Sequence, residues 1–159
     1  MTNFIPTANA GMLIRKPVAE VFEAITNPEI TTRFWFTKSS GKLEAGKQVK
    51  WEWEMYGVAS QVDVKILEEN KRILMDWSTF GSDETPSQVD WVFTAHGDDT
   101  TFLDVTNSGF SGTDEQIVQE ALGSTGGFTW VLAGLKALLE HDIELNLVRD
   151  RFPSGKPGQ

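Results

Sequence analysis

Residues 113–148 read TDEQIVQEALGSTGGFTWVLAGLKALLEHDIELNLV, and they predict one long helix from about residue 114 to about residue 148. Thr113 and Gln116 have the spacing of a capping box, which begins a helix. Glycines cost about 1 kcal/mol each inside a helix. GSTGG at residues 123–127 therefore predicts a kink beside a closely packed partner. The apolar stripe of this helix comprises Phe128, Val131, Leu132, Leu135, Leu138 and Leu139.

Upstream of this helix, between residues 48 and 108, the apolar residues recur with a period of two. This period is typical of strands that bury one face. Turns such as EENK at residues 68–71 and HGDD at residues 96–99 separate the runs, which predicts five strands in an antiparallel meander. Its inward-facing residues are Trp51, Trp53 and Met55, then Val62, Val64 and Ile66, then Ile73, Met75 and Trp77, then Val89, Trp91 and Phe93, then Leu103 and Val105.

The N-terminal part of the chain supplies one more strand and two short helices. Residues 9–16 predict the strand, and residues 18–27 predict a helix that follows Pro17. A second short helix is expected within residues 29–36.

This order of elements predicts an α+β fold, with a curved antiparallel sheet of about six strands wrapped around the long C-terminal helix. A helix of about 35 residues would span about 50 Å, so we expect a curved sheet that leaves space beneath the helix. The chain is expected to form a single domain over residues 1–159. Its core would lie at about residues 9–150 and a disordered tail at residues 153–159.

The composition is that of a globular protein and excludes several kinds of site. Of the 159 residues, 40% are apolar and none is cysteine, which excludes disulfides, thiolate nucleophiles and cysteine-based zinc sites. The net charge of −9 repels phosphate polymers, so nucleic acid is not an expected partner. Neither a signal peptide nor an apolar run of about 18 residues is visible, so we expect a cytoplasmic protein without a membrane partner.

Residues 49–57, VKWEWEMYG, alternate tryptophan with glutamate. Side chains alternate along a strand, so Trp51 and Trp53 are expected inside and Glu52 and Glu54 in solvent. The inward indoles either fill a core or line a cavity. Each buried indole N–H needs an acceptor, and water or a ligand in a cavity would supply one.

Four stretches together resemble the START-like (SRPBCC) superfamily, in the branch of homologues of the C-terminal domain of the activator of the 90-kDa heat-shock protein ATPase. The resemblance covers about residues 10–153 and implies a helix-grip fold with a cavity between sheet and long helix. It implies ligand binding or regulation of a partner, but no single chemistry, because this fold hosts many functions. The stretches are IRKPVAEVFEAITNPEITTRFWF (14–36), RILMDWS (72–78), TTFLDVTNSGF (100–110) and GFTWVLAGLKALLEHDIELNLVRDRFP (127–153).

Two positions differ from the pattern of that family. Asn107 stands where a histidine is often found, which argues against proton transfer at this point. Gly46 and Lys47 stand where a pair of glycines usually opens the second strand.

No catalytic or metal site is predicted, and no cofactor. His96 and His141 are the two histidines, and their separation does not have metal-ligand spacing. GSTGG lacks the preceding strand and the following lysine of a phosphate-binding loop. Asp76 is the one carboxylate to watch: if strand 72–78 had the opposite phase, Asp76 would enter the cavity as a general acid–base candidate.

The leading hypothesis is that a small apolar or amphipathic ligand binds beneath the C-terminal helix. One alternative is a co-chaperone-like protein that acts on a heat-shock-protein ATPase through its surface. A second is an enzyme of the cyclase or dehydratase kind, and the chain could be a monomer or a homodimer. The predicted ligand-binding residues are Trp51, Trp53, Met55, Met75, Trp77, Trp91 and Phe93 on the sheet, Phe128, Leu132 and Leu135 on the helix, and Trp35 and Phe110 at the mouth.

Overall fold

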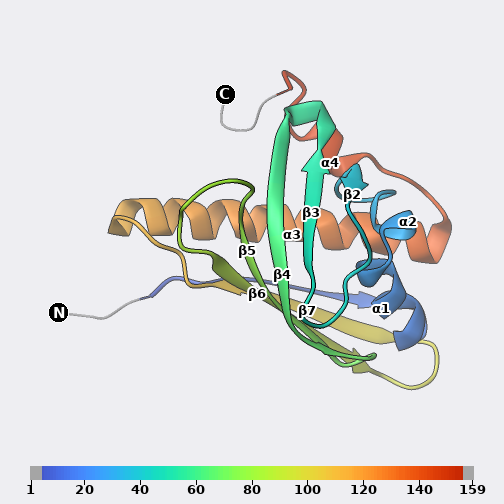
Figure 1. Ribbon diagram of the computed structural model, residues 1–159. Helices are drawn as coiled ribbons and strands as arrows, with labels where there is room; N and C mark the ends of the chain where they lie inside the picture. The colour runs from blue at the N-terminus through green and yellow to red at the C-terminus, as the bar shows by residue number, and fades with distance from the viewer. Residues whose placement is uncertain (1–4, 156–159) are drawn as a thin grey trace.

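The computed structural model describes residues 5–155 and contains one antiparallel sheet of seven strands (Figure 1). The strands lie in the order β1-β7-β6-β5-β4-β3-β2, so that β1 and β2 are the edges of an unclosed sheet. The two-residue β2 is the strand beyond the six expected. The bounds are β1 Ala8–Ile14, β2 Lys38–Ser39, β3 Gln48–Trp53, β4 Val58–Glu68, β5 Arg72–Thr79, β6 Ser87–Ala95 and β7 Thr101–Ser108.

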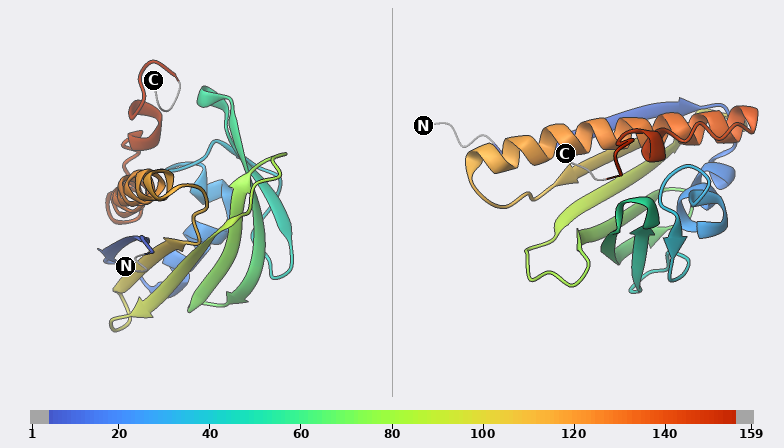
Figure 2. Two further views of the ribbon diagram at one scale, coloured as in Figure 1. Left: turned by 90° about the vertical axis from the view of Figure 1, so that its left-hand side faces the viewer. Right: turned by 90° about the horizontal axis from the view of Figure 1, so that it is seen from above.

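The sheet curls around α3, which is seen end-on in the left view of Figure 2. The short helices α1 and α2 lie near the C-terminal end of α3 in Figure 1. This arrangement confirms the predicted α+β helix-grip architecture of the START-like class. The helices are α1 Val18–Thr26, α2 Pro28–Thr31, the 3-10 turn η1 Glu54–Tyr56, α3 Asp114–His141 and α4 Leu147–Asp150.

The start of α3 is as predicted, but its end is not. The Thr113 side chain accepts from the Gln116 N–H at 3.2 Å, and the Thr113 N–H donates to the Gln116 side chain at 2.9 Å, which confirms the capping box. The expectation that the helix runs to about residue 148 is wrong. It ends at His141 because Asp142 adopts a left-handed conformation with φ 53°. Arg33, which is distant in sequence, donates to the exposed Asp142 carboxylate at 3.1 Å.

The glycine-rich segment of α3 is an uninterrupted part of the helix. A methyl group added at Gly123, Gly126 or Gly127 would meet no atom of another element within 4 Å. The expectation of a closely packed partner at this segment is therefore wrong. Gly134, about two turns after Gly127, is closely packed: a methyl group there would lie in van der Waals contact with Phe34, at 3.5 Å.

The C-terminal half of α3 is fixed to the edge strand β1 by charged groups. Lys136 Nζ donates to the Leu13 carbonyl at 2.6 Å and to Glu140 Oε2 at 2.7 Å. The same Glu140 oxygen accepts from the Arg15 N–H at 3.0 Å. The hydrogen bond from Lys136 holds the pKa of the Glu140 carboxyl below its ordinary value of 4.5.

The strand phases follow the predicted alternation except at the end of β4. A bulge between Val64 and Ile66 brings Leu67, and not Ile66 as expected, against the core. Trp51 and Trp53 are buried, at 1% and 7% exposure, while Glu52 lies on the outer face with Lys50 at 3.6 Å. Asp76 also lies on the outer face, where its carboxylate is 3.6 Å from Lys65 Nζ. The opposite phase, which a catalytic role for Asp76 required, is not the one in the structure.

The hairpin between β3 and β4 departs from the prediction. We expected Met55 to share the strand face of Trp51 and Trp53, but β3 ends at Trp53 and the chain enters η1. Gly57, with φ 63°, permits this tight turn. As a result Tyr56, and not Met55, is the buried residue of the turn.

The predicted disordered tail lies partly within the described residues. Pro153–Gly155 form a turn in which the Gly155 N–H donates to the Phe152 carbonyl at 2.9 Å, while residues 156–159 lie outside the described part. Within residues 5–155, no helix combines the length and hydrophobicity that a membrane crossing requires.

Candidate functional site

A pocket of about 420 Å³ lies beneath the N-terminal half of α3. Its volume is within the range of small-molecule sites, about 300–1,000 Å³. Three walls enclose it: the face of α3 that is turned toward the sheet, the sheet with the loop that follows β7, and the C-terminal segment after α3. The C-terminal half of α3 has no such space beneath it, because Leu132 and Leu135 are fully buried in the core.

The middle of the helix wall is made of small residues, with the larger Glu120 before them and Trp130 after them. Gly123 and Gly127 are one turn apart on the same face of α3, and both line the pocket with Ser124. Because neither glycine has a side chain, the helix backbone itself forms this wall. Phe128 and Val131 then close the wall toward the core.

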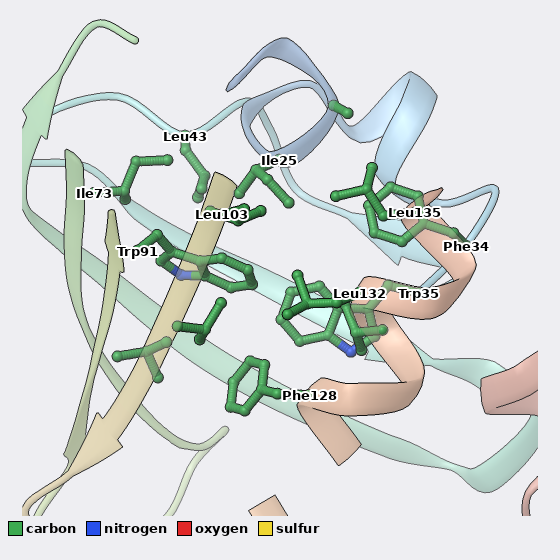
Figure 3. Packing of buried hydrophobic residues seen from close by; sticks show 14 of the residues in the cluster. Ile25, Phe34, Trp35, Leu43, Ile73, Trp91, Leu103, Phe128, Leu132 and Leu135 are labelled. Atoms are coloured by element: carbon green, nitrogen blue, oxygen red, sulfur yellow. The ribbon is translucent and has the colours of Figure 1, made fainter. Parts of the chain in front are cut away.

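The inner end of the pocket is aromatic. Trp35, Trp77 and Phe128 contact one another edge to face, with ring centroids 5.6–5.9 Å apart. Behind them, Trp35 also contacts Trp51 at 4.9 Å and Trp91 at 5.7 Å, so it joins the pocket wall to the core. Figure 3 shows Phe128 projecting from α3 toward Trp91 and Trp35. Such pairs each contribute about 0.5–1.5 kcal/mol beyond area burial, and they make this wall rigid.

A polar cluster interrupts the apolar lining on the sheet side. It consists of Asn107 on β7, Ser87 on β6 and Ser124 on α3, and all three residues line the pocket. Ser124 Oγ donates to Asn107 Oδ1 at 2.8 Å. Asn107 Nδ2 donates to the Gln88 carbonyl at 2.8 Å and to Ser87 Oγ at 3.1 Å. These bonds satisfy an amide that is only 3% exposed.

The C-terminal segment forms the third wall and is held by Tyr56. The Tyr56 hydroxyl lies within hydrogen-bonding reach of the Val148 and Arg149 carbonyls, the latter at 2.8 Å. Its ring meets that of Phe152 edge to face at 5.8 Å. Val148, Arg151 and Phe152 line the pocket with Tyr56. The β3–β4 hairpin therefore holds this wall in place.

The charged residues at the pocket are exposed. Glu120 on α3 and Arg151 in the C-terminal segment are the charged lining residues within residues 5–155. Over the same described range, no three histidine, aspartate or glutamate side chains are placed to hold a metal ion. The arrangement suits an apolar body with one polar group.

The structure brings four of the twelve predicted ligand-binding residues to this pocket: Trp35, Trp77, Phe110 and Phe128. Trp35 is 6% exposed and lies at the inner end, not at the mouth as expected. The other eight do not line this pocket. Met55 lines a separate space of about 150 Å³. Those in the packed core are Trp51, Trp53, Met75, Trp91, Phe93, Leu132 and Leu135.

The Trp91 indole N–H is buried without an acceptor among the described residues. Since Trp91 does not line the pocket, the pocket does not supply that acceptor. We expected water or a ligand in the cavity to accept from buried indole N–H groups, and for Trp91 this expectation is wrong.

Sequence reasoning missed most of the wall opposite the sheet. Gly123, Ser124 and Gly127 carried a usable signal, because three small residues on one helical face leave room beside a helix. Tyr56 was not predicted as a pocket residue, because we expected β3 to continue to Met55. Arg151 and Phe152 carried no signal, since their position depends on the turn at Asp142.

The family model for "Activator of Hsp90 ATPase homolog 1-like protein" matches residues 15–140. This chain belongs to that family. The resemblance to this START-like branch is thereby confirmed. No curated protein matches the chain.

Solved structures agree with the fold. A protein of Staphylococcus saprophyticus is 27% identical, with a TM-score of 0.72 over 87% of this chain and 95% of that chain. An Aha1 dimer from Colwellia psychrerythraea is 19% identical, with a TM-score of 0.68 over 85% and 96% of the two chains. An Hsp90 activator from Plasmodium falciparum is 16% identical, with a TM-score of 0.67 over 84% and 96%. At these identities the last two show likeness of fold alone.

Proposed function

We propose that this protein binds a small apolar or amphipathic molecule in the pocket beneath the N-terminal half of α3. The observation that carries the proposal is the helix wall: Gly123 and Gly127 leave about 420 Å³ open next to a rigid aromatic end. An apolar ligand would displace water from Trp35, Trp77 and Phe128 and gain about 25 cal/mol per Å² buried.

The test uses a neutral apolar dye, N-phenyl-1-naphthylamine, and a matched pair of variants. Gly127→Leu places a side chain at the pocket wall, whereas Gly126→Leu adds the same side chain to the exposed side of the same helix. Saturable dye binding with tryptophan quenching is expected for the wild type and Gly126→Leu, and at least about tenfold weaker binding for Gly127→Leu. Absence of saturable binding by the wild type would contradict the proposal, and so would equal affinity of the two variants.

A second candidate function is regulation of a chaperone through the protein surface. The family match supports it, since that family is described by homology to an activator of the Hsp90 ATPase. A surface role does not use the pocket, so Gly127→Leu should bind a chaperone as the wild type does. The affinities of the wild type and of both glycine variants for a surface-immobilised chaperone would test this. Size-exclusion chromatography with light scattering would show whether the acting form is a monomer or a homodimer.

A further inference from the structure

We propose that the ligand meets Asn107 with an uncharged hydrogen-bond donor, such as the O–H of an alcohol or phenol or an N–H group. This inference rests on the proposed function of the same pocket and narrows its ligand class. It follows from which donors and acceptors of the polar cluster are already occupied.

The orientation of the Asn107 amide is fixed by the backbone. The Gln88 carbonyl can only accept, and it lies 2.8 Å from Asn107 Nδ2. The nitrogen must therefore point toward β6, which leaves Oδ1 facing Ser124 on α3. Since Oδ1 can only accept, the Ser124 hydroxyl is the donor in the 2.8 Å bond between them.

Every hydrogen of the cluster is then in use. The two Nδ2 hydrogens of Asn107 go to the Gln88 carbonyl and to Ser87 Oγ. The hydroxyl hydrogen of Ser124 goes to Asn107, and that of Ser87 goes to the Trp77 carbonyl at 3.4 Å. The remaining capacity consists of lone pairs on Asn107 Oδ1, Ser87 Oγ and Ser124 Oγ, which are acceptors.

A ligand group that only accepts would face these lone pairs without a hydrogen between them. A carboxylate or phosphate would also lose its hydration without gaining a cation at the cluster. Glu120, on the same face of α3 one turn before Ser124, repels an anion. The lining cation, Arg151, lies over the Phe152 ring in the C-terminal wall and not at the cluster. The cluster therefore favours a neutral donor and disfavours an anion.

The experiment compares three compounds with the same two-ring body by isothermal titration calorimetry: 1-naphthol, which donates, 1-methoxynaphthalene, which only accepts, and 1-naphthoate, which is anionic. We expect 1-naphthol to bind the wild type about tenfold more tightly than the ether, and naphthoate more weakly than both. The extra methyl group of the ether adds apolar area, so a preference for naphthol cannot come from hydrophobicity.

Two variants locate the preference. Asn107→Leu should bring the naphthol-to-ether affinity ratio closer to one, because Leu removes the Asn107 acceptor and leaves only the Ser87 and Ser124 hydroxyls. Ser124→Ala should keep the ratio, because Asn107 Oδ1 still accepts. Should Asn107→Leu fail to fold, the wild-type ratio and the Ser124→Ala ratio decide.

Equal or tighter binding of the ether or of naphthoate to the wild type would overturn the inference. If that binding is lost in Gly127→Leu, the pocket function survives and the donor assignment alone is wrong. If none of the three compounds binds, the pocket function is wrong as well.

Discussion

The stability of two leucine variants tests the open helix wall independently of any ligand. In both Gly126→Leu and Gly127→Leu, replacing glycine inside α3 gains about 0.8 kcal/mol of helix propensity. No atom of another element lies within 4 Å of a methyl group at either position, so neither variant should be strained. The two leucine side chains differ in that the one at residue 127 lies at the pocket wall, whereas the one at residue 126 lies in solvent.

The difference between the two variants follows from the pocket. Full burial of a leucine side chain is worth about 1.5–3 kcal/mol, and burial of about half of it at the pocket wall is worth about 1 kcal/mol. Gly127→Leu should therefore stabilise the protein by about 2 kcal/mol and Gly126→Leu by about 0.8 kcal/mol. For a chain of this length, each kcal/mol raises Tm by about 2–4 °C. The expected increases are about 4–8 °C and about 2–3 °C.

Differential scanning calorimetry of the wild type and both variants measures these shifts. Equal increases in Tm would show that residue 127 gains nothing from the pocket, and the open wall would be refuted. A lower Tm for Gly127→Leu would show that the space beneath the helix is already filled.

Three further outcomes are expected. Tyr56→Phe removes the hydroxyl that bonds to the C-terminal segment and should lower the free energy of unfolding by about 0.5–1.5 kcal/mol. Amide hydrogen exchange of residues 147–152 should accelerate, while core amides remain protected. Unchanged exchange at residues 147–152 would contradict the role of Tyr56 in holding this segment. The pKa of the Glu140 carboxyl is below 4.5 in the folded protein, so its bond with Lys136 stabilises the folded state fully at pH values above 4.5. This stabilisation is lost as the pH falls through the folded-state pKa. Glu140→Gln should therefore lower the free energy of unfolding by about 1 kcal/mol at pH 7, as measured by urea denaturation, and the loss should shrink as the pH is lowered below 4.5. A loss that does not change with pH would assign the effect to packing. Asp76→Asn should leave dye affinity unchanged, because Asp76 lies on the outer face of the sheet.

The faces of the strands could be predicted from the sequence because each depends on a local rule. The alternation in VKWEWE alone places Trp51 and Trp53 inside and Glu52 outside. The capping box at Thr113 is likewise a contact between near neighbours in the chain. The order of these elements then predicted their arrangement, and the superfamily resemblance agreed with it.

The position of the pocket could not be predicted in the same way, because it depends on contacts between distant segments. The sequence does not show that Asp142 adopts the left-handed conformation that ends α3, or that Arg33 pairs with it. The chain after that turn returns toward Tyr56, where Val148 and Phe152 form the third wall. We expected the space beneath the helix to reach Leu132 and Leu135, but both side chains are fully buried in the core.

The glycines of α3 show why the pocket is at this end. A helix that only covered the sheet would gain about 1 kcal/mol from alanine at each of residues 123 and 127, and no neighbouring atom prevents it. At Gly134 an added methyl group would touch Phe34 at 3.5 Å, an ordinary van der Waals distance, so that position is closely packed although alanine would fit. Close packing therefore does not explain why residues 123 and 127 are glycine. An open pocket wall at this face of α3 explains both. Nothing in the structure explains Gly126, so glycine content by itself is not the argument. The argument is that two unforced glycines face the same space as Asn107 and an aromatic wall.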